Sequence, residues 1–145
     1  MSAEEIKALE RRLFEEWNKS KEALMALIDE YCAPDVIYHS AGGREIHGLK
    51  NFKRFMSEVY SAFPDIHVTL DDIVVEGDKV AIRYTWTGTH KGEIGGIPPT
   101  NKKVKVSVIQ IDQLVNGKFM EGWERSDTLG LMQQLGLVPT PKKEK

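Results

Sequence analysis

The chain has 145 residues, of which 41% are hydrophobic and 29% charged, as expected for one globular domain. Its net charge of -2 gives no electrostatic reason to expect a nucleic acid or an anionic membrane as partner, and its apolar runs are too short to cross a membrane. One cysteine excludes an internal disulfide, and the acidic N-terminus does not resemble a signal peptide, so we expect a cytoplasmic protein.

The first third of the chain has the apolar spacing of helices. Ser2 is a good N-cap, and apolar residues recur every three or four positions from Ile6 to Tyr31. The pattern weakens at 18–20, where we expect a bend or a break. Pro34 ends this helical part, because proline disfavours the helical conformation of the residue before it.

From Ile66 onwards the apolar period changes to two, which indicates strands. Asn116-Gly117 between two alternating runs is a strong signal for a two-residue β-hairpin turn. After Pro34 we expect a short strand at 36–39, a helix at 49–63, strands at 66–75, 79–90, 103–114 and 118–126, and a short helix at 128–135. Helices followed by a run of strands predict the α+β class, with a four-stranded antiparallel meander and one short extra strand.

The predicted hairpin fixes which side chains share a sheet face. In a regular two-residue hairpin the numbers of facing residues add to a constant, so Asp112 should face Glu121 and Gln110 should face Trp123. Two buried carboxylates that face each other cannot both ionise easily, so one would have a raised pKa. The alternative is that this face lies at an open rim, where both carboxylates would be solvated charges.

A series of short motifs runs along nearly the whole chain. They are Tyr38-His39-Ser40, Gly48-Leu49-Lys50-Asn51-Phe52, Ala62-Phe63-Pro64-Asp65, Glu76-Gly77-Asp78-Lys79-Val80, Thr87-Gly88-Thr89-His90-Lys91-Gly92, Gly96-Ile97-Pro98-Pro99-Thr100, Asn116-Gly117-Lys118, Glu121-Gly122-Trp123 with Asp127, and Leu129-Gly130-Leu131. In these motifs the chain resembles the SnoaL-like polyketide cyclases of the nuclear transport factor 2-like superfamily. The resemblance implies a cone-shaped, curved, mostly antiparallel sheet wrapped around N-terminal helices, a cystatin-like α+β barrel that often forms a homodimer through its sheet.

We expect a single domain of this kind over 1–138 and a flexible tail over 139–145. The resemblance implies a cofactor-independent enzyme that closes a ring by an intramolecular aldol step, using an aspartate and a histidine. Glu121, Glu124 and Asp127 all lie in the stretch where that aspartate is expected. Aldol chemistry needs one group that takes a proton from carbon and another that donates to the developing oxyanion.

Acidic and histidine side chains near the predicted pocket are the candidates for these roles. The catalytic candidates are Glu121, Asp127, His90, His39 and Asp112. The expected pocket and substrate-binding residues are Trp17, Tyr38, Met56, Tyr60, Tyr84, Trp86, Gln110, Trp123 and Arg125. Strand alternation allows only one of Tyr38 and His39 to face the pocket, and for the aromatic residues plain core packing is the alternative.

The expected ligand is a small, largely apolar carbonyl compound, which would undergo aldol cyclisation or isomerisation. The four histidines have no metal-ligand spacing, and no glycine pair opens a helix as in a phosphate-binding loop, so we expect neither a metal nor a cofactor. Two other functions stay open. One is an epoxide hydrolase of the limonene-epoxide-hydrolase type, with a water held between Arg125 and Asp127, and the other is a ligand-binding module without catalysis.

Overall fold

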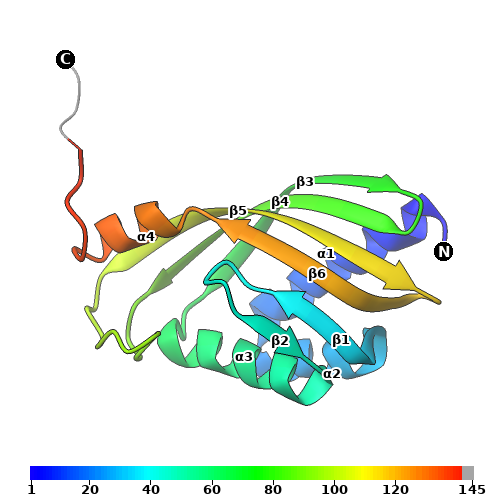
Figure 1. Cartoon of the computed structure of the whole chain (residues 1–145), viewed down its shortest axis with the longest axis horizontal. Helices are drawn as coiled ribbons and strands as arrows, with labels where there is room; N and C mark the ends of the chain where they lie inside the picture. The colour runs from blue at the N-terminus through cyan, green and yellow to red at the C-terminus, as the bar shows by residue number, and fades with distance from the viewer. Residues whose placement is uncertain (142–145) are drawn as a thin grey trace.

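The computed structural model describes residues 1–141, over which four helices and six strands form (Figure 1). The last four residues of the predicted tail, 142–145, lie outside the described part. The helices are α1 (Ala3–Lys19), α2 (Lys21–Tyr31), α3 (Leu49–Ala62) and α4 (Thr128–Gln134). The strands are β1 (Cys32–His39), β2 (Glu45–His47), β3 (His67–Glu76), β4 (Lys79–Thr89), β5 (Lys103–Val115) and β6 (Lys118–Ser126).

All six strands belong to one sheet in the order β2-β1-β6-β5-β4-β3. The pair β1–β6 is parallel and the other pairs are antiparallel, so the predicted mostly antiparallel α+β fold and its meander β3 to β6 are confirmed. The short strand β2 was not predicted. The helices α1, α2 and α3 pack on one side of the curved sheet and enclose the apolar core, while α4 follows β6 at one end (Figure 1).

The predicted break in the first helical stretch is confirmed at Ser20. The extended backbone of Ser20 ends α1 and begins α2, and its hydroxyl accepts a hydrogen bond from the backbone N–H of Ala23. Strand β1 starts directly after α2, so Pro34 lies inside a strand and the predicted strand at 36–39 is four residues too short at its start. No helix within the described residues is both long and apolar enough to cross a membrane.

The hairpin between β5 and β6 begins as predicted but contains a bulge. Asn116 and Gly117 both have positive φ, as a type I′ turn requires, and Leu114 pairs with Phe119. The next pair is Gln113 with Glu121, so one extra residue, Met120, is inserted in β6.

The bulge corrects the predicted register by one residue. Asp112 faces Gly122 and Gln110 faces Glu124, so the predicted pairs Asp112–Glu121 and Gln110–Trp123 are wrong. Because side chains alternate along a strand, one inserted residue moves every later side chain to the opposite face. Glu124 therefore points to the inner face, and Trp123 points outward.

The start of the loop between β4 and β5 is tied to the end of α3. The backbone N–H groups of Lys91 and Gly92 both donate to the carbonyl oxygen of Ala62, at 2.9 and 3.1 Å. A Cβ atom at position 92 would collide with the backbone carbonyl of Ser61, which cannot move without disturbing α3.

Substitution of Gly92 by Ala should therefore destabilise the fold. We expect the free energy of unfolding, measured by urea denaturation, to fall by about 1–3 kcal/mol. Gly42→Ala is the matched control, because an added Cβ at Gly42 meets no atom within 4 Å. Equal stability of the two variants would contradict this packing argument.

Candidate functional site

A cavity lies between the inner face of the sheet and the N-terminal helices. Its volume is about 70 Å³, and its apolar walls include Leu13, Phe14, Leu24, Ile28, Phe52 and Met56. The polar side chains that face it come from α1, β1, β4, β5 and β6, and they include Glu10, Tyr38, Tyr84, Gln110, Asp112 and Glu121. The volume is below the roughly 300–1,000 Å³ of pockets that enclose a whole drug-sized ligand, so the cavity admits one end of such a molecule.

Two carboxyl groups meet in this apolar cavity. Glu10 of α1 and Asp112 of β5 are 1% and 7% exposed. Burial raises the pKa of Glu10 well above its ordinary value, and the nearby charge of Asp112 and its hydrogen bond to that residue raise it further. Burial also raises the pKa of Asp112, against the opposing effect of its hydrogen bonds to Glu10 and Gln110. A hydrogen bond between two carboxyl groups requires one proton, so the pair together carries a single negative charge.

Gln110 connects this pair to two phenols. Its amide Nε2 donates to Asp112 Oδ1 at 2.8 Å, and its Oε1 lies 3.3 Å from the hydroxyl of Tyr38 and 3.4 Å from that of Tyr84. Burial raises the pKa of both tyrosines well above the ordinary value, and the neighbouring Glu124 charge adds to this. Both phenols therefore stay neutral and act as hydrogen-bond donors.

Glu124 is the half-buried carboxyl at the other end of this network. The backbone N–H of Ala41 donates to its Oε2 at 3.1 Å. Burial raises the pKa of Glu124 above the ordinary value, although its hydrogen bonds to Ala41 and Tyr38 lower it in part, and the charge of Asp112 raises it. A continuous polar chain thus runs from Glu10 through Asp112, Gln110 and the two tyrosines to Glu124.

Five of the predicted lining residues do face this cavity, namely Trp17, Tyr38, Met56, Tyr84 and Gln110, as does the predicted acid Asp112. Two other predicted wall residues lie elsewhere. Tyr60 donates its hydroxyl to the carbonyl of Trp17 at 2.6 Å, and Trp86 packs edge-on against Phe63 at 4.8 Å between ring centroids. Neither belongs to the cavity lining.

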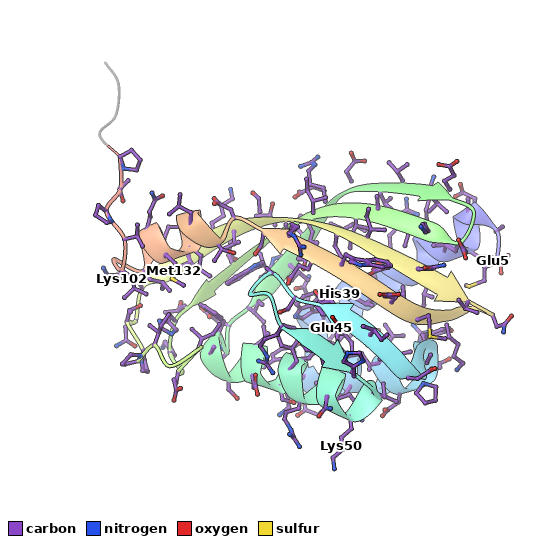
Figure 2. All side chains as sticks on the ribbon, in the orientation of Figure 1. Glu5, His39, Glu45, Lys50, Lys102 and Met132 are labelled. Carbon is purple, nitrogen blue, oxygen red and sulfur yellow. The ribbon has the colours of Figure 1, made fainter. Side chains whose placement is uncertain are left out.

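His39, Glu121 and Trp123 form a cluster on the outer side of the sheet. Because Tyr38 points inward, its neighbour His39 points outward, and Figure 2 shows His39 near Glu45 of β2. The ring of His39 stacks on Trp123 with 5.5 Å between centroids, and its Nε2 lies 2.6 Å from Glu121 Oε2. Glu121 also touches the cavity wall, but its carboxylate is bonded to His39. The bulge in β6 accounts for this placement.

His90 is buried away from the cavity. Its Nδ1 accepts a hydrogen bond from the backbone N–H of Thr100 at 3.2 Å, and its ring lies beside Phe63. His90 thus holds the two ends of the loop between β4 and β5 together and does not face Asp112 or Glu124.

The arrangement expected for an epoxide hydrolase is not formed in the cavity. Asp127 caps α4, where its side chain accepts a hydrogen bond from the backbone N–H of Gly130 at 2.9 Å. The exposed Arg125 donates to the backbone carbonyl of Glu124 at 2.7 Å. Within the described residues 1–141, no group of three or more histidine, cysteine or acidic side chains is arranged to hold a metal ion.

Sequence reasoning missed Glu10 and did not favour Glu124. Glu10 occupies the apolar stripe of α1, four residues after Ile6, three before Leu13 and seven before Trp17. An acid at such a position is a signal for a buried functional group, and it could have been read from the spacing. The direction of the Glu124 side chain depends on the bulge in β6, for which the sequence contains no clear signal.

The family model described as "SnoaL-like polyketide cyclase" matches residues 7–135. The chain belongs to this family. It is 28% identical over 120 residues to the nogalonic acid methyl ester cyclase of Streptomyces nogalater, covering 81% of this chain and 88% of that protein.

Solved structures share the fold. TsrD from Streptomyces laurentii superimposes with a TM-score of 0.82 at 28% identity, covering 95% of this chain and 99% of that one. A protein of ketosteroid isomerase-like fold from Catenulispora acidiphila DSM 44928 gives a TM-score of 0.72 at 18% identity, covering 92% and 97%, and supports the fold alone. The predicted family and nuclear transport factor 2-like fold are therefore confirmed.

The raised pKa of Glu10 has a consequence for stability. The ordinary value is 4.5, so above this pH the unfolded chain releases the Glu10 proton while the folded chain keeps it. Stability is then lost as the pH rises from 4.5 towards the folded pKa, at about 1.4 kcal/mol for each pH unit between the two values.

Glu10→Gln should remove this loss. We expect the free energy of unfolding of the variant, relative to the wild type, to increase between pH 5 and pH 8, as measured by urea denaturation at several pH values. Glu15→Gln, on the exposed side of the same helix, should follow the wild type. A parallel pH dependence of wild type and Glu10→Gln would show that Glu10 titrates normally.

Proposed function

We propose that this protein is a cofactor-independent cyclase that closes a ring in a polyketide-type methyl ester by an intramolecular aldol step. The observation that carries the proposal is the half-buried Glu124 carboxylate, which shares a hydrogen-bonded network with Tyr38 and Tyr84. These two neutral phenols line the apolar cavity, and Glu124 lies behind them without lining it. Family membership and the methyl ester named for the Streptomyces nogalater relative support the substrate class.

Glu124 is the general base of the proposed reaction. Of the three acids in the stretch where the resemblance implies a catalytic aspartate, Glu121 is bonded to His39 on the outer face and Asp127 caps a helix. Glu121 contributes to the cavity wall but its carboxylate is bonded to His39, whereas Glu124 lies opposite Gln110 and is hydrogen-bonded to Tyr38. Its raised pKa makes it a stronger base than an ordinary carboxylate, and its partial exposure still allows it to ionise.

Tyr38 and Tyr84 are the donors for the oxyanion that forms. Their contacts with Gln110 are long, at 3.3 and 3.4 Å, and therefore weak. Either hydroxyl can exchange this contact for a shorter, charge-assisted bond to an alkoxide oxygen. Such donors stabilise the transition state most strongly in apolar surroundings, and the walls of this cavity are mainly apolar.

The proposed step balances without another reactant. Glu124 takes a proton from the carbon beside a carbonyl group, and the electron pair left on that carbon forms the new carbon–carbon bond to a ketone carbon of the same molecule. The π electrons of the ketone move to its oxygen, which then receives the proton from Glu124. The product is an isomer of the substrate and carries a new hydroxyl group.

Substitution of Glu124 by Gln should abolish most of the turnover. With nogalonic acid methyl ester as probe, we expect kcat to fall by about 10²–10⁴-fold, because the base is lost while the shape is kept. Tyr84→Phe should lower kcat by about 10²-fold, through loss of an oxyanion donor. Liquid chromatography with mass detection would follow the isomer of unchanged mass. Glu45→Gln, on the exposed strand β2, is the control, and full activity of Glu124→Gln would refute the assignment.

The pH profile of kcat/KM tests the same base separately. Glu124 must be ionised, so the rate should fall as the pH drops through a pKa that lies above the ordinary 4.5. Asp112→Asn removes a charge that raises this pKa, so the acidic limb should move to lower pH. An unchanged limb in Asp112→Asn would show that another group controls the profile.

A further inference from the structure

The closed end of the cavity contains polar groups that the folded chain leaves without ordinary partners. In the described residues, no N–H or hydroxyl group donates to either carboxyl oxygen of Glu10, whose hydrogen-bonding neighbour is the Asp112 carboxyl. The indole Nε1–H of Trp17, from the same helix, also has no acceptor among residues 1–141. Both residues line the cavity. Buried polar groups without partners cost about 1–3 kcal/mol each, which a suitable ligand would recover.

The charges around these groups limit which ligand can enter. The two carboxyls of Glu10 and Asp112 share one proton, so the closed end carries a negative charge. Among the described residues, no lysine, arginine or histidine lines the cavity. A carboxylate ligand would be desolvated next to a like charge and would find no cation, which is strongly unfavourable.

The groups without partners include both a hydrogen-bond donor and a hydrogen-bond acceptor. Trp17 offers a donor, and it needs a carbonyl or other oxygen acceptor. Neither carboxyl oxygen of Glu10 receives a hydrogen bond from an N–H or hydroxyl group of the described residues, so Glu10 offers an acceptor to a ligand hydroxyl. A neutral ligand that carries a hydroxyl and a carbonyl group satisfies both residues.

We propose that the closed end of the cavity, at Glu10 and Trp17, is a binding site for the neutral β-hydroxycarbonyl group of a ligand. The hydroxyl donates to Glu10 and the carbonyl oxygen accepts from the Trp17 indole. The hydroxyl that the proposed aldol step forms lies at Tyr38, Tyr84 and Glu124, so this site goes beyond the proposed function and recognises a second hydroxycarbonyl end of the ligand. Binding at this site needs no turnover, and it can be tested without it.

Three small probes separate the contributions of the hydroxyl group and of the neutral ester to binding. Methyl 3-hydroxybutyrate carries both neutral groups, methyl butyrate lacks the hydroxyl, and 3-hydroxybutyrate replaces the ester by a carboxylate. Affinities are measured by two-dimensional ¹H–¹⁵N NMR titration of the whole protein. The chain has three tryptophans, and the indole signal absent from Trp17→Phe identifies that of Trp17.

For the wild type we expect methyl 3-hydroxybutyrate to bind about five- to tenfold more tightly than methyl butyrate, because of one additional hydrogen bond. It should shift the Trp17 indole proton downfield. The carboxylate probe should bind at least about tenfold more weakly than the hydroxy ester. No shift of the Trp17 indole signal, or equal affinity for ester and carboxylate, would overturn the proposal.

Variants of the protein show which residue causes each difference in probe affinity. Glu10→Leu should abolish the preference for the hydroxy ester over methyl butyrate, and an apolar residue is expected to be tolerated in this interior. Trp17→Phe should weaken the binding of both esters about fivefold. Asp112→Asn should improve binding of the carboxylate about tenfold by removing a charge. Glu15→Gln is the control for the helix surface.

These results are distinguishable from those for the proposed function. If Glu10→Leu keeps the full preference for the hydroxy ester, this site is wrong, whatever the turnover of nogalonic acid methyl ester. If the wild type binds the probes as described and forms no isomer, the site stands and the proposed reaction is wrong.

Discussion

The burial of two carboxyl groups in an apolar interior is the constraint on which the rest of the site depends. Glu10 and Asp112 cannot both be ionised there, because two unpaired buried charges would cost far more than a small domain can offset. One shared proton and the amide of Gln110 reduce that cost. The remaining single charge then acts on its surroundings. It raises the pKa of Glu124 at the other end of the network, so the two ends of the polar chain are electrostatically coupled.

One inserted residue decides which acids take part. Without the bulge at Met120, Glu121 and Trp123 would face inward, and Glu124 would face solvent. The bulge instead brings Gly122 opposite Asp112. A Cβ atom at Gly122 would lie 2.8 Å from Asp112 Oδ1 and 3.4 Å from the ring of Tyr38, so a glycine at this position leaves the space that the carboxylate occupies. The bulge and the glycine therefore act together: the bulge places Gly122 opposite Asp112, and the missing side chain leaves space for the buried acid.

Most of the fold could be predicted from local pattern, and much of the site could not. Period-two alternation placed Asp112 and Gln110 on the inner face, because regular strands keep their parity. The same rule failed in β6, because a bulge there reverses which side chains point inward. The local sequence does not show where such a bulge occurs. Strand β2 was missed because its pairing with β1 comes from tertiary contact, and three residues carry little periodicity.

Helix α1 illustrates a different limit. Its apolar stripe is evident from the sequence, and the stripe contains one acid, Glu10. The spacing shows that Glu10 belongs to the apolar stripe, but it does not show its partner Asp112, which lies more than a hundred residues later in the chain and meets Glu10 through packing of α1 on the sheet. Functional sites of this kind violate the local rule that charges stay outside, so a single misplaced charge in an otherwise regular stripe is informative.

The graded exposure along the polar chain explains why its two ends suit different tasks. Glu124 is only half-buried, so it can exchange its proton and still feel the charge of Asp112. At the closed end, Glu10 is almost completely buried and its raised pKa keeps it protonated, which makes it a poor base. A neutral acid beside a desolvated indole is instead suited to orient a ligand through hydrogen bonds. Proton transfer therefore belongs near Glu124, and recognition belongs at Glu10 and Trp17, with Gln110 and the tyrosines between them.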